Sequence, residues 1–371
     1  MKRKMIVCQT PFQVIVALFL NNQIKKNDEC KVDAVITNTF NGYENLVKRL
    51  SDRQLFDRVI CADAKECIQA KGKKGNILKL FKVLFPGKIA SSLDCDLFEY
   101  TEMFCWNYDA YTASIRSYLE LKKHHIKVNI FDEGYISYMP IDDVIPKRGF
   151  MKIIELRNRI SGIGNITREN IDGMYLFEPE LILYKPGCPI YKIDREIGKE
   201  HKFKEDIEYI FETKKVISNY DKKYIIFEEA MLANNPHIDD EKILDNFIDM
   251  VGKENVIVKL HPRTKEDRFA EKGIKTLGSD GIPWEAIVLA GNFEDKVFMT
   301  IGSGSVTNCR MLFGSSMNSY MLFKIVRPPM SQFDTKYDNF WNRLEDKNGD
   351  STKGLKIPKS MKELTDLLEI S

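Results

Sequence analysis

Short apolar runs alternate with amphipathic segments along most of this chain, and this alternation limits its fold more than any other feature. In the first part, apolar runs at residues 5–8, 32–37, 58–61, 97–104 and 127–131 predict strands, with helices between them. Strands that alternate with helices are typical of a parallel sheet covered by helices on both faces. Residues 1–139 are therefore predicted to form a Rossmann-like α/β domain.

The alternation breaks in the middle of the chain and then returns. Glycine and proline interrupt residues 140–202 repeatedly, which predicts a loop-rich insertion and a crossover between domains. Because such loops often contact substrates, we predict acceptor recognition in this segment. Further apolar runs at 224–227, 256–260, 296–301 and 320–325 predict a second parallel sheet. Residues 203–371 are therefore predicted to be a second Rossmann-like domain.

Composition and charge exclude several classes of protein. The 371 residues are 43% hydrophobic and 30% charged, as expected for a soluble chain with two cores. The 56 basic residues nearly balance the 54 acidic ones, so no overall field favours nucleic acid. The eight cysteines are scattered without a CxxC pair, which is typical of reduced core thiols. Few histidines and no Cys/His cluster make a structural zinc site unexpected.

The amino-terminal apolar run is too short to cross a membrane. Polar residues interrupt it at Gln9, Thr10 and Gln13, and it resumes only over residues 14–20. A first strand followed by a helix that begins near Pro11 fits this pattern better than a signal peptide. We therefore predict a cytoplasmic protein.

A pair of carboxylates ends one predicted strand. Asp132, Glu133 and Gly134 directly follow the apolar run at 128–131. Adjacent carboxylates at a buried strand end repel each other and are partly desolvated, so one of them is expected to have a raised pKa. Such a group can act as a general base near neutral pH, and Gly134 allows a tight turn or the close approach of a ligand. The alternative is a solvated acidic pair.

A histidine and a proline end a second predicted strand. His261 and Pro262 follow the run at 256–260, and the proline fixes the backbone direction after the histidine. An imidazolium can protonate or hydrogen-bond a leaving phosphate oxygen, and Lys259 and Arg263 can add positive charge. The alternative is a structural histidine with solvated cations beside it.

Small residues follow a third predicted strand, at 297–301, and open a predicted helix. Backbone N–H groups and hydroxyls of Ser303, Gly304, Ser305 and Thr307 are candidates to bind a phosphate there. The segment has neither the P-loop lysine nor the glycine spacing of a dinucleotide site. The alternative is an ordinary serine-rich helix cap.

Two further stretches leave alternatives open. Glu228 and Glu229 follow the run at 224–227, where they can bind ribose hydroxyls, act as the base, or simply lie at the surface. Residues 71–88 interleave lysines with large apolar residues. This pattern is typical of a helix that lies on anionic lipid, but a helix packed on its own sheet has a similar pattern.

Taken together, the strand ends resemble those of bacterial sialyltransferases, which carry a D/E-D/E-G motif, an HP motif and a Ser/Thr motif in this order. The stretch Val-Cys-Gln-Thr-Pro-Phe-Gln at 7–13 is also similar to the amino end of family 52 glycosyltransferases, which include lipooligosaccharide sialyltransferases. The resemblance implies a GT-B-type fold, with two Rossmann-like domains facing across a central cleft. It also implies inverting, metal-independent transfer of sialic acid from CMP-sialic acid to a galactoside-type hydroxyl of a surface glycan, in lipooligosaccharide or capsule.

The resemblance also implies roles for individual residues. A carboxylate of Asp132 or Glu133 would take the acceptor proton, with Glu228 or Glu229 as the second choice. His261 would assist the departure of CMP, and the loop from Ser303 to Thr307 would hold its phosphate. Similar family members have an aspartate shortly after the strand that precedes HP, and this chain has Glu-Glu-Ala-Met at 228–231 instead. The identity of the base therefore stays open.

The sequence leaves other functions and partners open. A related transferase that uses a UDP-sugar and a non-catalytic nucleotide- or glycan-binding protein are the alternatives. The expected partners are a nucleotide-sugar donor and a glycan acceptor, with no nucleic acid and no cofactor. A membrane surface at the inner face of the membrane and a second copy of the chain stay open as further partners.

Overall fold

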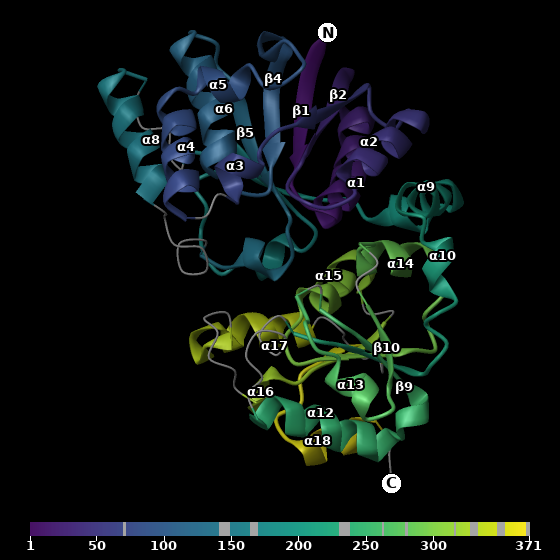
Figure 1. Ribbon diagram of the computed structural model, residues 1–371. Helices are drawn as coiled ribbons and strands as arrows, with labels where there is room; N and C mark the ends of the chain where they lie inside the picture. The colour runs from purple at the N-terminus through teal and green to yellow at the C-terminus, as the bar shows by residue number, and fades with distance from the viewer. Residues whose placement is uncertain are drawn as a thin grey trace. The chain divides into compact units, whose positions relative to one another are not determined.

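The computed structural model divides into two compact units, Met1–Phe211 and Glu212–Ser371 (Figure 1). It describes residues 1–69, 72–140, 149–163, 170–229, 238–261, 263–278, 281–314, 317–326, 333–346 and 353–368. Each unit contains one parallel sheet with helices on both faces, so the predicted α/β class is confirmed. Among the helices in these ranges, none combines the length and hydropathy that a membrane crossing requires.

The sheet of the first unit has seven strands in the order β3-β2-β1-β4-β5-β6-β7. They are β1 (Lys2–Cys8), β2 (Cys30–Thr37), β3 (Arg58–Ala62), β4 (Tyr100–Cys105), β5 (Lys127–Phe131), β6 (Gly173–Leu176) and β7 (Ile190–Lys192). The order reverses at β1, which pairs with β2 on one side and β4 on the other. Open α/β sheets bind ligands at the carboxyl ends of the strands beside such a reversal.

Helices cover both faces of this sheet (Figure 1). One face carries α1 (Pro11–Asn27) and α2 (Tyr43–Asp52), with α9 (His201–Phe211) packed against α2. The other face carries α3 (Lys65–Ile68), α4 (Gly72–Leu84), α5 (Gly87–Ala90), α6 (Ala110–Leu121) and α8 (Gly149–Ile160). The 3₁₀ turns are η1 (Leu97–Glu99), η2 (Tyr135–Tyr138), η3 (Pro179–Leu181) and η4 (Glu196–Lys199).

Helix α1 shows how the local sequence sets these elements. The Thr10 hydroxyl accepts the N–H of Gln13 at 3.2 Å and so caps the first turn. Further along, the Phe19 ring lies 5.5 Å from that of Phe177 and 4.7 Å from that of Phe203. Helix α1 is therefore buried between the sheet and the later segments of the unit.

The boundary between the units differs from the predicted division at 139/140 and 202/203. Strands β6 and β7 lie within residues 140–202 and extend the first sheet beyond β5. Helix α9 also packs on this unit, where the Arg53 guanidinium lies 4.3 Å from the centre of the Tyr209 ring. The segment from 140 to 211 is thus part of the first unit. Its strands have only four and three residues, too few to produce a readable apolar period.

The sheet of the second unit has six strands in the order β10-β9-β8-β11-β12-β13. They are β8 (Tyr224–Phe227), β9 (Val256–Lys259), β10 (Lys275–Leu277), β11 (Val297–Thr300), β12 (Asn318–Met321) and β13 (Gly354–Lys356). One face carries α14 (Trp284–Ala290) and α15 (Gly304–Phe313), and the other carries α12 (Ile238–Val251) and α18 (Met361–Leu367) (Figure 1). The remaining elements are α10 (Lys214–Ile217), η5 (Lys253–Asn255), α13 (Arg268–Glu271), α16 (Phe323–Val326), η8 (Thr335–Tyr337) and α17 (Asp338–Asp346).

Two predicted elements of the second half are divided in the structure. The predicted strand at 320–325 ends at Met321, and residues 323–325 belong to helix α16. The pattern of residues 203–216 also predicts one helix, but the structure divides it between α9 and α10, because Glu212 adopts φ 54° between them. A positive φ ends a right-handed helix, and the apolar pattern does not record it.

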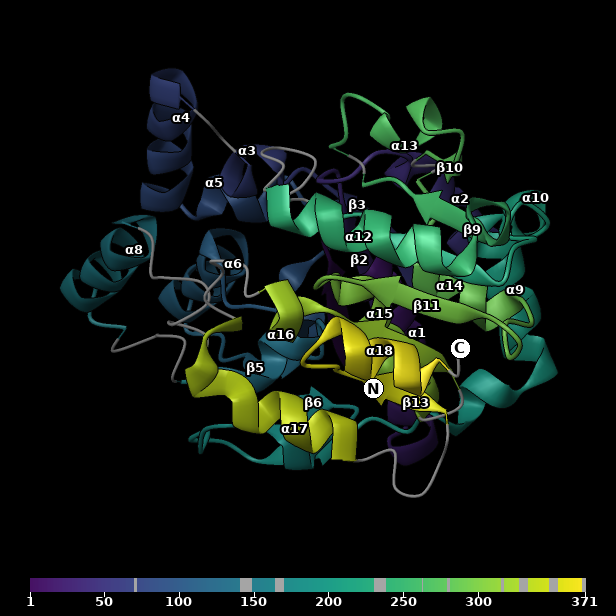
Figure 2. The ribbon, with the colours of Figure 1, turned by 90° about the horizontal axis from the view of Figure 1, so that it is seen from below.

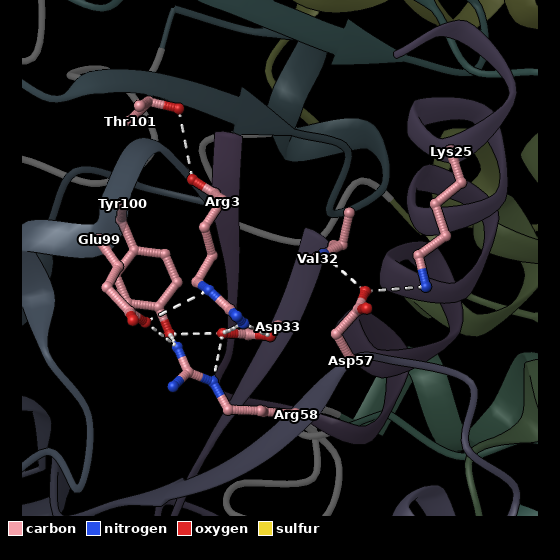
Figure 3. Close-up of polar contacts among 9 residues, drawn as sticks. All are labelled: Arg3, Lys25, Val32, Asp33, Asp57, Arg58, Glu99, Tyr100 and Thr101. Carbon is pink, nitrogen blue, oxygen red and sulfur yellow. Dashed lines mark hydrogen bonds and ion pairs between the residues drawn. The ribbon is translucent and has the colours of Figure 1, made fainter. Parts of the chain in front are cut away.

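A buried ion network joins four strands near the amino edge of the first sheet (Figure 3). Asp33 on β2 is 0% exposed, and its carboxylate accepts from Arg3 on β1 at 2.8 and 2.9 Å. The same carboxylate accepts from Nε of Arg58 on β3 at 2.9 Å and from the hydroxyl of Tyr100 on β4 at 2.7 Å. The Glu99 carboxylate lies 2.6 Å from Arg58 and 3.3 Å from Arg3, so it shares their positive charge.

Candidate functional site

Three strand ends meet at the carboxyl edge of the second sheet. Strand β8 lies between β9 and β11, and Phe227 is in register with Lys259 on one side and Thr300 on the other. The residues that follow these strands therefore emerge together. The structure brings the predicted site residues Glu228 and His261 to this edge, next to the loop that starts helix α15.

Glu228 fixes the loop that carries the histidine. Its side chain is 4% exposed, and Oε2 accepts the backbone N–H of His261 at 3.0 Å and the hydroxyl of Thr264. Arg268 lies 4.0 Å from Oε1. The carboxylate is thus engaged within the protein, which gives Glu228 a positioning role rather than the predicted role of base or ribose ligand.

Glu229 has a similar positioning role in the loop that follows β11. Its Oε1 accepts the backbone N–H of Gly302 at 2.8 Å and the hydroxyl of Thr300. A Cβ on Gly302 would lie 2.2 Å from the Phe333 ring, so only glycine fits at this point of the loop. Glu229 therefore sets the path of the chain from β11 into α15.

His261 is partly exposed, and its hydrogen bonding defines its tautomer. Nδ1 accepts the backbone N–H of Arg263 at 3.1 Å, so the neutral ring carries its hydrogen on Nε2. Burial, and then the positive charge of Arg263, lower the pKa of His261, against an opposing effect of the Glu228 charge. At neutral pH, His261 is therefore a hydrogen-bond donor through Nε2 rather than the imidazolium that the sequence suggested.

The loop before α15 is the candidate phosphate site that the sequence predicted. Ser303 is the N-cap of α15 and its hydroxyl accepts the N–H of Ser305 at 3.3 Å. Ser303, Gly304 and Ser305 are all partly exposed at the positive end of a ten-residue helix. The Ser303 N–H donates to the Thr300 hydroxyl at 2.9 Å, so the candidate donors to a phosphate are the Gly304 N–H and the hydroxyls of Ser303 and Ser305.

Two of the other predicted contacts, Thr307 and Lys259, have partners within the protein. Thr307 is 0% exposed and its hydroxyl donates to the Gly304 carbonyl at 2.9 Å, so it does not reach the surface of the loop. Lys259 donates to the Tyr220 hydroxyl at 3.1 Å and lies 5.9 Å from the centre of the Tyr220 ring. Pro262 lies outside the described residues.

Asp132 organises the Asp-Glu-Gly turn of the first unit. It is 0% exposed, Oδ1 accepts the Gly134 N–H at 2.7 Å, and Oδ2 accepts the Phe177 N–H at 3.0 Å and the Tyr138 hydroxyl. Gly134 has φ 82° and ψ −159°, which only glycine adopts readily. Asp132 is thus buried, and both of its carboxylate oxygens accept hydrogen bonds from within the protein.

Glu133 is the partly exposed member of the pair. Its backbone N–H donates to the Ser137 hydroxyl at 2.8 Å, which fixes the turn. Burial first, and then the negative charge of Glu133, raise the pKa of the Cys8 thiol at the carboxyl end of β1. That end flanks the reversal of strand order, where a ligand is expected.

The sequence did not single out the polar residues at this reversal. The Gln9 side chain accepts from Trp106 Nε1 at 3.0 Å and donates to Asp109 at 2.6 Å, which links the ends of β1 and β4. Trp106 also lines a mostly apolar cavity of about 310 Å³. The other lining residues are Asn107, Tyr108, Ile130, Ile136, Ser137, Met139, Pro140, Ile171, Met174, Tyr184, Lys185, Pro186 and Gly187. Only the strand order, which the sequence does not give, would have indicated this site.

Within the described ranges, we find no group of three or more His, Cys, Asp and Glu side chains arranged to hold a metal ion.

The pH dependence of stability tests the burial of Asp132. Burial raises its pKa from 3.8 to about 6, against the hydrogen bonds that favour the charged form. The protonated Asp132 carboxyl stabilises the folded protein fully below pH 3.8, and this contribution is lost as pH rises through about 6. Between these two values only the folded protein holds the proton. Relative to Asp132→Asn, the wild type is expected to lose roughly 2 kcal/mol between pH 4 and pH 7. Urea unfolding of both proteins at several pH values measures this, and a constant difference between them would contradict it.

Comparisons with known proteins address the fold and the family. A sequence profile described as Alpha-2,8-polysialyltransferase (POLYST) matches residues 4–314. No curated protein sequence matches the chain. The fold is similar to that of UDP-GlcNAc 2-epimerase from Methanocaldococcus jannaschii, at 12% identity and a TM-score of 0.55, covering 100% of this chain and 92% of the other.

Two further solved structures give the same result for the fold. Arabidopsis thaliana UGT89C1 complexed with UDP has 12% identity and a TM-score of 0.54, covering 100% of this chain and 90% of the other. UDP-GlcNAc 2-epimerase from Neisseria meningitidis bound to UDP-GlcNAc has 9% identity and a TM-score of 0.54, covering 100% and 98%. These similarities confirm the predicted GT-B-type fold. The profile match confirms the sialyltransferase class, whereas membership of family 52 stays a prediction.

Proposed function

The chain belongs to the alpha-2,8-polysialyltransferase family, and we propose that it transfers sialic acid from CMP-sialic acid to a glycan hydroxyl, with inversion and without a metal ion. The observation that supports this most directly is that His261 and the start of α15 follow β9 and β11, on either side of β8, at one carboxyl edge of the sheet in a chain of this family. A transferase that uses a UDP-sugar remains the alternative.

We assign the phosphate of CMP to the start of α15. Ser303, Gly304 and Ser305 are exposed enough to be reached, and their loop is held in place by Glu229. His261 would donate from Nε2 to an oxygen of the departing phosphate. Preorganised donors of this kind stabilise the charge that develops on the leaving group.

We assign the removal of the acceptor proton to Glu133. Its side chain is partly exposed at the carboxyl edge of the first sheet, whereas both oxygens of Asp132 accept hydrogen bonds inside the protein. Asp132 then acts by holding the turn that presents Glu133. The base and the donor site lie on different units of the chain.

The acceptor is expected to be a glycan that ends in sialic acid. The family description favours an alpha-2,8-linked acceptor over the galactoside that the sequence resemblance implied. The cavity beside the Glu133 turn is lined by Trp106, Tyr108 and residues 184–187, and aromatic surfaces of this kind pack against sugar rings. This supports acceptor recognition by the segment 140–202.

A donor and acceptor screen tests the function. We expect release of CMP from CMP-N-acetylneuraminic acid in the presence of EDTA, dependent on an oligosialic acid acceptor. Release with lactose alone would favour the galactoside acceptor. Turnover of a UDP-sugar in place of CMP-sialic acid would overturn the donor assignment, and CMP binding without turnover of any donor would indicate a binding protein.

His261 is expected to act as a neutral hydrogen-bond donor, and two substitutions at this position test that role. His261→Ala removes the donor and should lower kcat by about 10²–10³-fold. His261→Gln can donate from its amide and should retain most of that rate. Because the pKa of His261 is lowered, kcat should not fall between pH 7 and pH 8, as it would if an imidazolium were required. Equal losses in both variants would contradict the neutral-donor role.

A further inference from the structure

Helix α4 turns its apolar side toward solvent. Four of its large apolar residues and the residue that follows it are exposed by 40% or more, namely Ile77 (67%), Leu78 (40%), Phe81 (48%), Leu84 (41%) and Phe85 (54%). We call these five residues the α4 apolar face. The buried residues of α4 are Lys79 and Val83. A surface helix normally buries its apolar stripe and exposes its lysines, so this orientation needs a reason beyond packing in the monomer.

Helix α8 extends the same surface. The two helices are in contact, since Arg157 donates to the Val83 carbonyl and Lys79 lies 5.0 Å from the Phe150 ring. Leu156 and Ile160, one turn apart on α8, are 56% and 78% exposed. Figures 1 and 2 both show α4 and α8 beside each other at the margin of the first unit.

Positive charge surrounds the exposed apolar side chains. Helix α4 contains no acidic residue, and Lys73 and Lys74 at its start are exposed without an ion pair in the described part of the chain. Lys88, Lys152 and Arg159 are exposed near the ends of the two helices. Glu155 is the single acidic residue of α8 and is partly buried.

We propose that the surface formed by α4 and α8 docks the protein on an anionic phospholipid membrane. An apolar centre with a cationic rim is complementary to acyl chains beneath negative headgroups, and each lysine near such a surface contributes about 1 kcal/mol. With 13 residues, α4 lies in the plane of the interface and is too short to cross the bilayer. This inference goes beyond sialyl transfer and does not depend on the donor.

Vesicle co-sedimentation of the full chain tests the membrane surface. We expect binding to vesicles that contain phosphatidylglycerol, little binding to phosphatidylcholine alone, and release at high salt. The double variant Phe81→Ser/Phe85→Ser and the double variant Lys73→Gln/Lys74→Gln should each weaken binding about 10-fold or more. Tyr209→Ser removes a comparably exposed aromatic from α9, on the other face of the sheet, and should bind as the wild type does.

Three results would overturn the membrane surface. They are failure of the wild type to bind anionic vesicles, unchanged binding by both double variants, and a solution dimer that the phenylalanine variant converts to a monomer. The last result would show that the surface formed by α4 and α8 binds a second copy of the chain instead of a membrane. Transfer to a soluble acceptor should be unchanged in all these variants, so failure of this inference is distinguishable from failure of the proposed reaction.

Discussion

Replacing Glu133 with glutamine is expected to lower kcat for sialyl transfer about 10²–10⁴-fold while leaving the affinity for CMP unchanged. The acceptor hydroxyl must lose its proton as it attacks, and the amide cannot accept that proton. The fold should tolerate the change, because Glu133 is partly exposed and the turn is held by its backbone N–H and by Asp132. Initial rates with CMP-sialic acid measure the loss, and calorimetry measures CMP binding.

Two control variants distinguish loss of the catalytic base from disturbance of the turn that carries it. Glu44→Gln removes an exposed carboxylate from α2 and should leave kcat unchanged. Asp132→Asn should disturb the turn, and this should lower the stability of the first unit. It should lower kcat only as a result of that disturbance. A Glu133→Gln protein that retains its rate, together with a stable Asp132→Asn protein that loses it, would identify Asp132 as the base instead.

The elements predicted best are those whose local sequence determines them. Thr10 followed by proline marks the start of α1, and the apolar runs before Asp132 and His261 end where strands β5 and β9 end, within one residue. The short strands β7, β10 and β13 escaped prediction, and only residues 175 and 176 of β6 fall in a stretch with an extended pattern. Their three or four residues are strands because they pair with longer neighbours, which is a property of tertiary structure rather than of local pattern.

The site was predictable as a set of positions but not as a set of roles. Chemistry-bearing residues at strand ends indicated where Glu228, His261 and Ser303 would emerge. The direction of each side chain was not readable, so inward-facing carboxylates at 228 and 229 and the buried hydroxyl of Thr307 were taken for ligand contacts. Gln9 was missed because its importance depends on β4 lying beside β1, although the two strands are far apart in the chain.

Replacing Asp33 with alanine is expected to lower the free energy of unfolding of the first unit by about 3–5 kcal/mol. The change leaves the guanidinium groups of Arg3 and Arg58 side by side without the buried carboxylate, and only the exposed Glu99 still pairs with both (Figure 3). The Arg3 side chain is only 13% exposed, so water cannot compensate fully, and the Tyr100 hydroxyl loses its acceptor. Urea unfolding followed by circular dichroism measures the loss.

Asp57 offers a matched control from the same part of the sheet. Its carboxylate accepts the Val32 N–H at 2.9 Å and pairs with Lys25 at 3.0 Å, but its side chain is 29% exposed (Figure 3). Asp57→Ala should therefore cost only about 1 kcal/mol, because water replaces the lost contacts. Equal losses in the two variants would show that burial of Asp33 does not set its importance. Because the network lies near the amino edge of the sheet and Glu133 follows a carboxyl end, Asp33→Ala should keep its kcat wherever it is folded. An Asp33→Ala protein that is less stable but keeps its kcat would show that the network stabilises the sheet without taking part in the reaction.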